Sequence, residues 1–389
     1  MKRRPLELIN GVFYTGSEVI RNGRMRVDAD GRIAYIGSRE GSDPDNRDAP
    51  VVDLAGRTVV PGFIDVHIHG GGGWDLLRGN PEDFEGTARF HAAHGTTAFL
   101  ATIGPNTEAE TVRIVDNARK AQSKGIEAGA EVIGVHLEGP FLNPLRKGAM
   151  NESMFRPPDI REMDRYIEAS GNTIRLITTA PELPGGEAFV RGLVDRGIRV
   201  SVGHSDASYE QMADAVRWGA SHTTHHFNGM RPFHHRDPGT AGAGLMMPEL
   251  TTELIADGVH VHPAAVRFLF DVKGEYKVCA VTDAIAYAGM PDGEYGHSVV
   301  TGGEVYLKGT NTLAGSSLTM LKALHLVMQY TGRPLERVLP SFTAVPARQA
   351  GVDDRKGTLE PGKDADFLIL GEGLELLGTY VRGICAAGA

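Results

Sequence analysis

The sequence predicts an α/β protein, in which a (β/α)₈ barrel carries a small β-sandwich domain formed by both termini. Two observations lead to this fold class. Strand-like and helix-like segments alternate through the middle of the chain, which is typical of a parallel sheet with helical crossovers. Both ends instead carry short strand-like segments separated by glycine-containing turns. We therefore expect a barrel over residues 59–344 and a small β domain made of residues 1–58 and 345–389.

The small domain is expected to be assembled from the two ends of the chain. Its amino-terminal strand candidates are ELINGVFYTG, EVIRNGRMRVD, GRIAYIGS and TVVPG. Asn-Gly pairs in these segments favour tight hairpin turns, because both residues tolerate a positive φ. The carboxyl-terminal end carries similar short strand candidates, FLIL and LLGTYVRGI.

Apolar segments of the middle region are candidates for the barrel strands. In chain order they are FIDVHIHG, TAFLATIG, EVIGVHLEG, IRLITTAPE, IRVSVGHS, SHTTHHFNG, TTELIADGVH and KVCAVTDA. Helices are expected at 81–94, 107–123, 159–170, 208–218 and 316–330. Eight strands that alternate with helices fit a closed barrel better than an open sheet.

Composition excludes several classes of function. Of the 389 residues, 41% are hydrophobic and 23% are charged, as in ordinary globular proteins, and the net charge of −9 offers no basic stripe to a nucleic acid. No apolar run approaches the roughly 20 residues of a membrane span, and MKRRPLELIN lacks the apolar stretch of a signal peptide. Cys279, expected in the core, and Cys385 make no disulfide framework, so a cytoplasmic location is expected.

Residues that bind metals or transfer protons stand at the ends of the predicted barrel strands. In a (β/α)₈ barrel the carboxyl ends of the strands form one rim, so such residues would converge there. They are His67, His69, Glu138, His204, His225, His260 and Asp283.

The first of these residues indicate a metal site. His67 and His69 are two positions apart on one strand and so share a face, and neutral imidazoles suit a divalent transition metal. An HxH pair elsewhere would be an ordinary polar patch, so its position at the end of the first strand decides the interpretation. Glu138 follows an apolar run, where an unpaired charge is costly. We expect a metal beside it, with an ion pair that holds a loop as the alternative.

His204 and His225, each structural if alone, form with Glu138 a set of three ligands that leaves room for water, as in catalytic sites. Asp283 would suit a general base, although aspartate at a strand end also serves as a turn or a helix cap. His136 shares the face of Glu138, and a supporting role for the metal site and a purely structural role are both open. The remaining histidines considered are interpreted as structural: His91, His94, His222, His226, His234, His235 and His262.

These motifs resemble those of a known family. PGFIDVHIHG is similar to the first-strand signature of the amidohydrolase superfamily. The segments that resemble N-acetylglucosamine-6-phosphate deacetylases are, in order, HLEGPFLNPLRKGAMN, GHSDAS, THHFNGMRPFHHRDPG, IADGVH, VTDA and LAGSSLTM. The closing GTLEPGKDADFLIL resembles the strand return of the superfamily, so the resemblance covers essentially the whole chain. The fourth strand lacks the lysine that bridges two metals in dihydroorotases and hydantoinases.

The resemblance implies hydrolysis of an acetyl amide by metal-activated water. Glu138, His204 and His225 would hold the principal metal, and His67 and His69 a second one. The ligand types suit zinc, iron, manganese or cobalt. Asp283 would be the catalytic carboxylate, and His260 would polarise the acetyl carbonyl.

The resemblance also implies a phosphate clamp made of Asn228, the backbone NH of Gly229, and Arg236. Arginine can chelate phosphate oxygens with two nitrogens, and an ion pair with Asp237 is the alternative role of Arg236. In the family this arginine can come from a neighbouring subunit, which implies a homodimer. Met150 stands where many members have a histidine that holds sugar hydroxyls. N-acetylgalactosamine 6-phosphate, an N-acyl amino acid, and a non-catalytic sugar-phosphate-binding role therefore stay open beside N-acetylglucosamine 6-phosphate.

Overall fold

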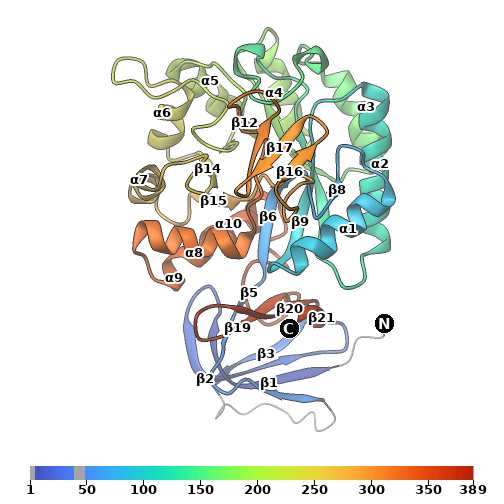
Figure 1. Ribbon diagram of the computed structural model, residues 1–389, viewed down its shortest axis with the longest axis vertical. Coiled ribbons are helices and arrows are strands. Elements are labelled where there is room, and N and C mark those ends of the chain that lie inside the picture. Colours follow the sequence, from blue (N-terminus) through green and yellow to red (C-terminus); the bar gives the residue numbers. More distant parts are fainter. Residues whose placement is uncertain (1–4, 39–48, 389) are drawn as a thin grey trace.

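The computed structural model describes residues 5–38 and 49–388, so the first four residues of the segment examined for a signal peptide lie outside it. Figure 1 shows a barrel surrounded by helices, with a smaller β domain below it. In the described ranges, no helix has both the length and the apolar character that crossing a membrane requires.

Eight parallel strands form the barrel, and they are adjacent in chain order. They are β6 (Phe63–Ile68), β9 (Thr96–Ile103), β10 (Glu131–Glu138), β11 (Ile174–Thr179), β12 (Arg199–Val202), β13 (His222–Thr223), β14 (Thr251–Ile255) and β15 (Val278–Val281). The last strand meets the first just beyond their ends, where Asp283 N donates to His67 O at 2.9 Å and His69 N donates to Ala284 O at 2.8 Å. The predicted barrel is therefore confirmed, and its apolar strands are buried because helices cover their outer faces.

Helices follow the strands around the barrel. They are α1 (Pro81–Ala92), α2 (Glu108–Lys124), α3 (Ile160–Ser170), α4 (Gly186–Asp195), α5 (Tyr209–Trp218), α6 (Gly239–Met246), α7 (Pro263–Lys273), α8 (Met320–Thr331), α9 (Leu335–Val338) and α10 (Ala344–Gln349). The predicted helices correspond to α1, α2, α3, α5 and α8, although α8 begins at Met320 rather than at 316. α2 and α5 begin where predicted because the Thr107 and Ser208 side chains accept hydrogen bonds from the first-turn amides.

Two small groups of short strands lie outside the barrel sheet. A three-stranded antiparallel sheet is formed by β16 (Gly293–Tyr295), β17 (Ser298–Thr301) and β18 (Glu304–Leu307). A two-residue hairpin pair, β7 (Gly70–Gly71) and β8 (Trp74–Asp75), follows β6 directly.

The small domain is one continuous sheet made of both ends of the chain. Its strands are β1 (Leu6–Tyr14), β2 (Val19–Val27), β3 (Ile33–Ser38), β4 (Val51–Asp53), β5 (Thr58–Pro61), β19 (Phe367–Leu370), β20 (Leu376–Val381) and β21 (Ile384–Gly388). Antiparallel pairing of β5 with β19 joins the two halves, which enclose an apolar cluster containing Phe13, Met25 and Phe367. Figure 1 shows β19–β21 between the barrel and β1–β3. The division at residues 58/59 and 344/345 stays a prediction.

The Asn-Gly pairs do not form the predicted hairpin turns. Asn10 and Asn22 have φ of 58° and 49°, but they lie inside β1 and β2. The pairing register shifts at Gly11, so the positive φ accommodates an irregularity within the strands rather than a connection between them. The turn prediction was wrong because a local dipeptide preference does not determine where a strand ends.

A buried lysine connects the carboxyl-terminal segment to the start of β10. The Lys356 side chain is 0% exposed, and its Nζ contacts Asp366, Glu131 at 2.8 Å and Asp364 at 3.2 Å. Burial alone would raise the pKa of Glu131, but Lys356 and Arg355 outweigh burial and lower that pKa to about 2. These ion pairs hold the small domain against the barrel end opposite to the strand carboxyl ends.

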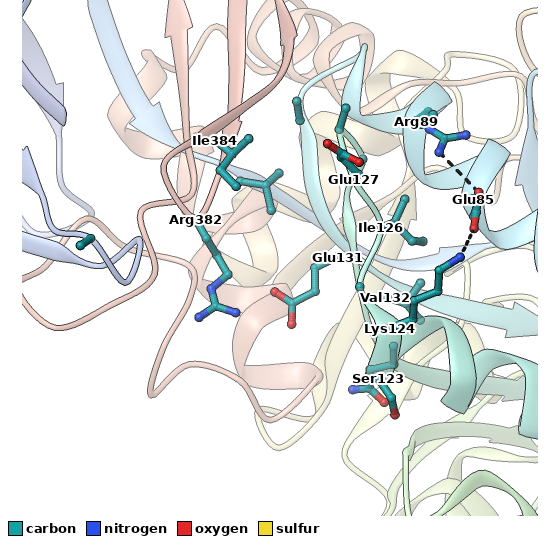
Figure 2. A pocket seen from close by; sticks show the side chains of 17 residues that line it. Glu85, Arg89, Ser123, Lys124, Ile126, Glu127, Glu131, Val132, Arg382 and Ile384 are labelled. Atoms are coloured by element: carbon teal, nitrogen blue, oxygen red, sulfur yellow. Dashed lines mark hydrogen bonds and ion pairs between the residues drawn. The ribbon is translucent and has the colours of Figure 1, made fainter. Parts of the chain in front are cut away.

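A cavity of about 820 Å³ lies beside this junction, between the ends of α1 and α2 and the strand β21 (Figure 2). Glu85, which lines it, accepts hydrogen bonds from Lys124 at 2.9 Å and from Arg89 at 3.4 Å. Its described lining residues include none of the predicted site residues, so this cavity is separate from the predicted chemistry.

Candidate active site

Glu138, the last residue of β10, lies at the centre of the candidate site. Its Oε1 is 3.2 Å from His204 Nε2 and 3.1 Å from His225 Nε2, and its Oε2 is 3.1 Å from His69 Nε2. His67 Nε2 lies 3.5 Å from Oε1. The structure therefore brings together the five residues predicted to bind metal, around a carboxylate that is only 2% exposed.

These residues fall into two overlapping groups that can bind a metal. One is His67, His69 and Glu138, and the other is Glu138, His204 and His225; in each group the potential ligand atoms lie within 4.8 Å of one another. Glu138 belongs to both, so its carboxylate is placed to bridge two ions.

Hydrogen bonds at the far side of the rings prepare the histidines for a metal. His204 Nδ1 lies 2.7 Å from Arg146 O, and His225 Nδ1 lies 3.1 Å from Asn228 O. A carbonyl oxygen only accepts, so each Nδ1 carries a proton, and Nε2 is the ring nitrogen whose lone pair a metal beside Glu138 would use. The residues present therefore fit a divalent cation.

The charges of the cluster lead to the same conclusion. Burial alone would lower the pKa of His69, but hydrogen bonds to Asp283 and Glu138 raise it to about 9. The pKa of His67 is likewise raised well above its ordinary value, against burial, by Glu138, Asp283 and Glu253. Positive charge inside the barrel thus stabilises the buried carboxylates. A metal that displaces the ring protons would supply this charge.

Three site residues adopt a left-handed backbone just beyond the strand that precedes them. His204, His225 and Asp283 have φ of 47°, 28° and 50°. Such conformations are unfavourable for residues with a side chain and occur often at functional sites. The tight turns direct these side chains back over the barrel mouth instead of along the strand.

The strand predicted to carry His225 and His226 is shorter than expected. β13 ends at Thr223, so neither histidine lies on the strand that was predicted to carry it. His226 is fully buried, with Nδ1 3.2 Å from Thr223 Oγ1, which agrees with its structural interpretation. His136 is also buried, and Thr102 and Thr178 hydroxyls contact its two nitrogens behind His67.

Asp283 lies at the border of the cluster. Its Oδ1 is 3.3 Å from His69 Nε2 and 3.5 Å from His67 Nε2, and the residue is 8% exposed. Burial would raise its pKa, but the two histidines lower it, so the carboxylate is ionised at neutral pH. An ionised carboxylate beside the predicted ligands can accept a proton.

His260 lies apart from this cluster. It follows β14 by a short loop, and its Nδ1 contacts Asp257 Oδ2 at 2.6 Å. Among the described residues, Asp257 rather than a ligand histidine is its partner, and the pairing leaves Nε2 available. Sequence reasoning missed Asp257, although it stands in the same IADGVH motif.

The predicted phosphate clamp lies on the loop after β13. Gly229 has φ of 57°, and a Cβ there would lie 3.1 Å from His204 Nδ1 and 3.2 Å from His225 Cε1, so the backbone packs directly on two ligands. Asn228 Nδ2 donates to His225 O at 3.3 Å. The loop therefore places the predicted clamp residues beside two of the predicted metal ligands.

Arg236 is exposed on the same loop. Its Nη1 lies 2.9 Å from His235 Nε2, whereas Asp237 is bound by Arg231, with Nε 3.1 Å from Oδ2. The ion pair considered between Arg236 and Asp237 is therefore not formed. Met150 is half-buried on the loop after β10, where its amide donates to Lys147 O at 3.0 Å.

Two buried carboxylates near the ligands were missed by sequence reasoning. Asp65 on β6 accepts hydrogen bonds from His67 N at 3.1 Å and from Thr282 Oγ1 at 2.6 Å, and burial raises its pKa to about 7. Glu253 on β14 lies 2.9 Å from His67 Nδ1. Both interrupt apolar strands, the signal that singled out Glu138, and so both were detectable.

A (β/α)₈ barrel with buried histidines and a shared carboxylate at the strand ends defines a metal-dependent hydrolase of the amidohydrolase class. Residues 58–385 match the Amidohydrolase family, and the chain belongs to it. Within this family the chain groups with the N-acetylglucosamine-6-phosphate deacetylases, as the sequence motifs predicted. It is 36% identical over 376 residues to that enzyme of Bacillus subtilis (strain 168), which covers 95% of this chain and 94% of the relative.

Two further comparisons bear on the substrate. The structure of N-acetyl-D-glucosamine-6-phosphate deacetylase from Mycobacterium smegmatis, in complex with N-acetyl-D-glucosamine-6-phosphate, matches with a TM-score of 0.90 at 32% identity, covering 99% of this chain and 100% of that one. N-acetylgalactosamine-6-phosphate deacetylase from Escherichia coli O157:H7 is 35% identical over 343 residues, covering 87% of this chain and 90% of the relative.

Proposed function

We propose that this protein hydrolyses the acetyl amide of N-acetylglucosamine 6-phosphate to glucosamine 6-phosphate and acetate. The observation that carries the proposal is the buried cluster in which Glu138 joins four histidines beside Asp283. The Bacillus and Mycobacterium relatives, whose names state this substrate, support it.

In this proposal Glu138, His204 and His225 would hold one divalent cation, and His67, His69 and Glu138 would hold a second one. Histidine and carboxylate ligands suit zinc, iron, manganese or cobalt. Such a cation, when bound, polarises a carbonyl oxygen and acidifies water.

Asp283 is proposed as the general base and then the general acid. Its carboxylate accepts a proton from the water that attacks the acetyl carbonyl carbon, and it returns a proton to the departing amine nitrogen. His260 is proposed to hydrogen-bond the acetyl oxygen through Nε2 when that nitrogen is protonated, because Asp257 holds the ring at Nδ1.

The phosphate is proposed to bind Asn228, the Gly229 amide and Arg236. The exposed guanidinium of Arg236 supports this role, since its nearest recorded partner is only the neighbouring His235. Its position on an outer loop also suits contact with a second subunit, and a homodimer in the cytoplasm is part of the proposal.

N-acetylgalactosamine 6-phosphate is the second candidate substrate, favoured by the Escherichia coli relative and by Met150. A thioether cannot donate a hydrogen bond to a sugar hydroxyl, so the residue at this position does not select one epimer as a histidine would.

The test is acetate release by the metal-loaded protein from N-acetylglucosamine 6-phosphate, its galactosamine epimer and unphosphorylated N-acetylglucosamine. We expect the highest kcat/KM for the first and a strong loss without the phosphate. Preference for the epimer would replace the substrate and keep the chemistry. No release from any of the three would overturn the proposed function.

A further inference from the structure

Glu253 is a buried carboxylate that contacts both halves of the ligand cluster. It lies in the middle of β14 and is 0% exposed. Its Oε2 is 2.9 Å from His67 Nδ1 and accepts a hydrogen bond from His225 N, also at 2.9 Å. One oxygen atom thus joins the His67–His69 group to the Glu138–His204–His225 group.

Glu253 contacts histidine rings and a backbone amide, rather than the cationic side chain of a lysine or an arginine. Besides the two contacts of Oε2, Oε1 lies 3.1 Å from His222 Nε2. A buried carboxylate is costly, and an uncharged side chain of similar size would fill the space with a smaller desolvation cost. Packing therefore does not explain why this buried residue is charged. Its contacts with the proposed ligand residues do.

The contact with His67 determines which ring nitrogen faces the site. An ionised carboxylate only accepts, so His67 Nδ1 carries a proton, and Nε2 is directed to Glu138, His69 and Asp283. A carboxylate behind a ligand histidine fixes the tautomer and makes the ring a better donor to a metal.

The contact with His225 acts through the backbone. His225 has φ of 28°, an unfavourable conformation, and its amide is held by Glu253 Oε2. β13 ends two residues earlier, and this hydrogen bond lies between two backbone contacts of the turn, Thr224 N to Val202 O and His226 N to Glu253 O, both at 3.0 Å.

We propose that Glu253 is a positioning residue shared by both halves of the metal centre: it selects the ligating tautomer of His67 and holds the turn that presents His225. This inference rests on the proposed metal ligands but not on the proposed substrate.

The test compares Glu253→Gln with Thr252→Val, a matched control on the same strand. Thr252 is equally buried, and among the described residues its hydroxyl contacts only Lys277 O, at 3.3 Å. Glutamine keeps the size but removes the charge, so His67 Nδ1 faces a neutral amide instead of a carboxylate. We expect Glu253→Gln to weaken Zn²⁺ and Co²⁺ binding about 10- to 100-fold, measured by competition with a chromophoric chelator. The control should bind like the wild type.

Metal-free and metal-loaded melting temperatures separate positioning from stability. We expect added Zn²⁺ to raise the Tm of Glu253→Gln by less than it raises that of the wild type. In the zinc-loaded variant, histidine ring NMR should show an Nδ1–H signal of His67 that differs from that of the zinc-loaded wild type. Metal affinity within about threefold of the wild type, with only a lower metal-free Tm, would overturn the proposal.

If Glu253→Gln does not fold, Glu253→Asp replaces it. Aspartate keeps the charge but withdraws it by one methylene group, so an intermediate loss of metal affinity is expected, and unchanged affinity would contradict the role. These measurements need no substrate, so they fail or succeed independently of the deacetylase assay.

Discussion

Glu138 and Asp283 are two buried carboxylates whose surroundings suit them to different proposed roles. Glu138 is enclosed by four imidazoles, so its oxygens are committed to the centre of the cluster. The Asp283 carboxylate contacts His67 and His69 and is somewhat more exposed. At the residue scale, the first carboxylate is suited to bridging cations and the second to moving protons.

Replacing Asp283 by asparagine tests this division. The change removes the proton acceptor but none of the five proposed metal ligands, so we expect kcat to fall by about 10²- to 10⁴-fold while bound metal is retained. Steady-state kinetics and elemental analysis of the dialysed protein measure the two quantities. A variant with near-normal kcat would show that another group is the base.

At the element scale, the loop after β13 carries residues proposed for both metal binding and phosphate binding. The strand is only two residues long, and His225, Phe227 and Gly229 follow it with φ of 28°, 78° and 57°. The loop therefore leaves the barrel wall early and turns across the mouth, carrying a ligand at its start and Arg236 further along.

Arg236→Gln tests the outer part of this loop. A charged hydrogen bond contributes about 1.5–3 kcal/mol, so we expect KM for the phosphorylated sugar to rise about 10- to 100-fold. Activity on unphosphorylated N-acetylglucosamine should stay the same, because the ligands are untouched. Arg191→Gln, on exposed α4 beside Glu187, is the control. Equal losses on both substrates would contradict a phosphate contact.

At the scale of the whole molecule, the Lys356 ion pairs join the two domains. Removing one partner of a buried ion pair costs about 3–5 kcal/mol, because the remaining charges stay buried without compensation. We expect Lys356→Met to lower the free energy of unfolding by this amount, measured by chemical denaturation. Lys120→Met, which removes an exposed pair with Asp116, should change it little.

The same cluster predicts a pH dependence. The pKa of Glu131 is lowered from 4.5 to about 2, so the stability that its ionised form contributes is complete above pH 4.5 and is lost as the pH falls towards 2. We expect the wild type to lose stability across this window and Lys356→Met to lose less. Denaturation curves at several pH values measure both, and parallel pH profiles would contradict the assignment.

The barrel and most of the candidate site were predictable from local patterns. β10 ends at Glu138 as expected, and His67, His204, His225 and Asp283 lie at or just beyond strand ends. Their convergence follows from the architecture, because the carboxyl ends of all barrel strands share one rim. The length of β13 was not predictable, since its end depends on a turn held by contacts from another strand.

The sequence by itself determined the fold class and the residues able to bind metal, because strand period, burial and side-chain chemistry are local properties. The enzyme family was indicated by the resemblance of its motifs to those of known deacetylases. Only the tertiary structure decided which atoms meet. Glu253 contacts His67 across 186 positions of the chain, and Asp237 binds Arg231 instead of Arg236. Such pairings depend on how strands and loops pack in three dimensions, and a charge in an apolar strand reveals its burial but not its partner.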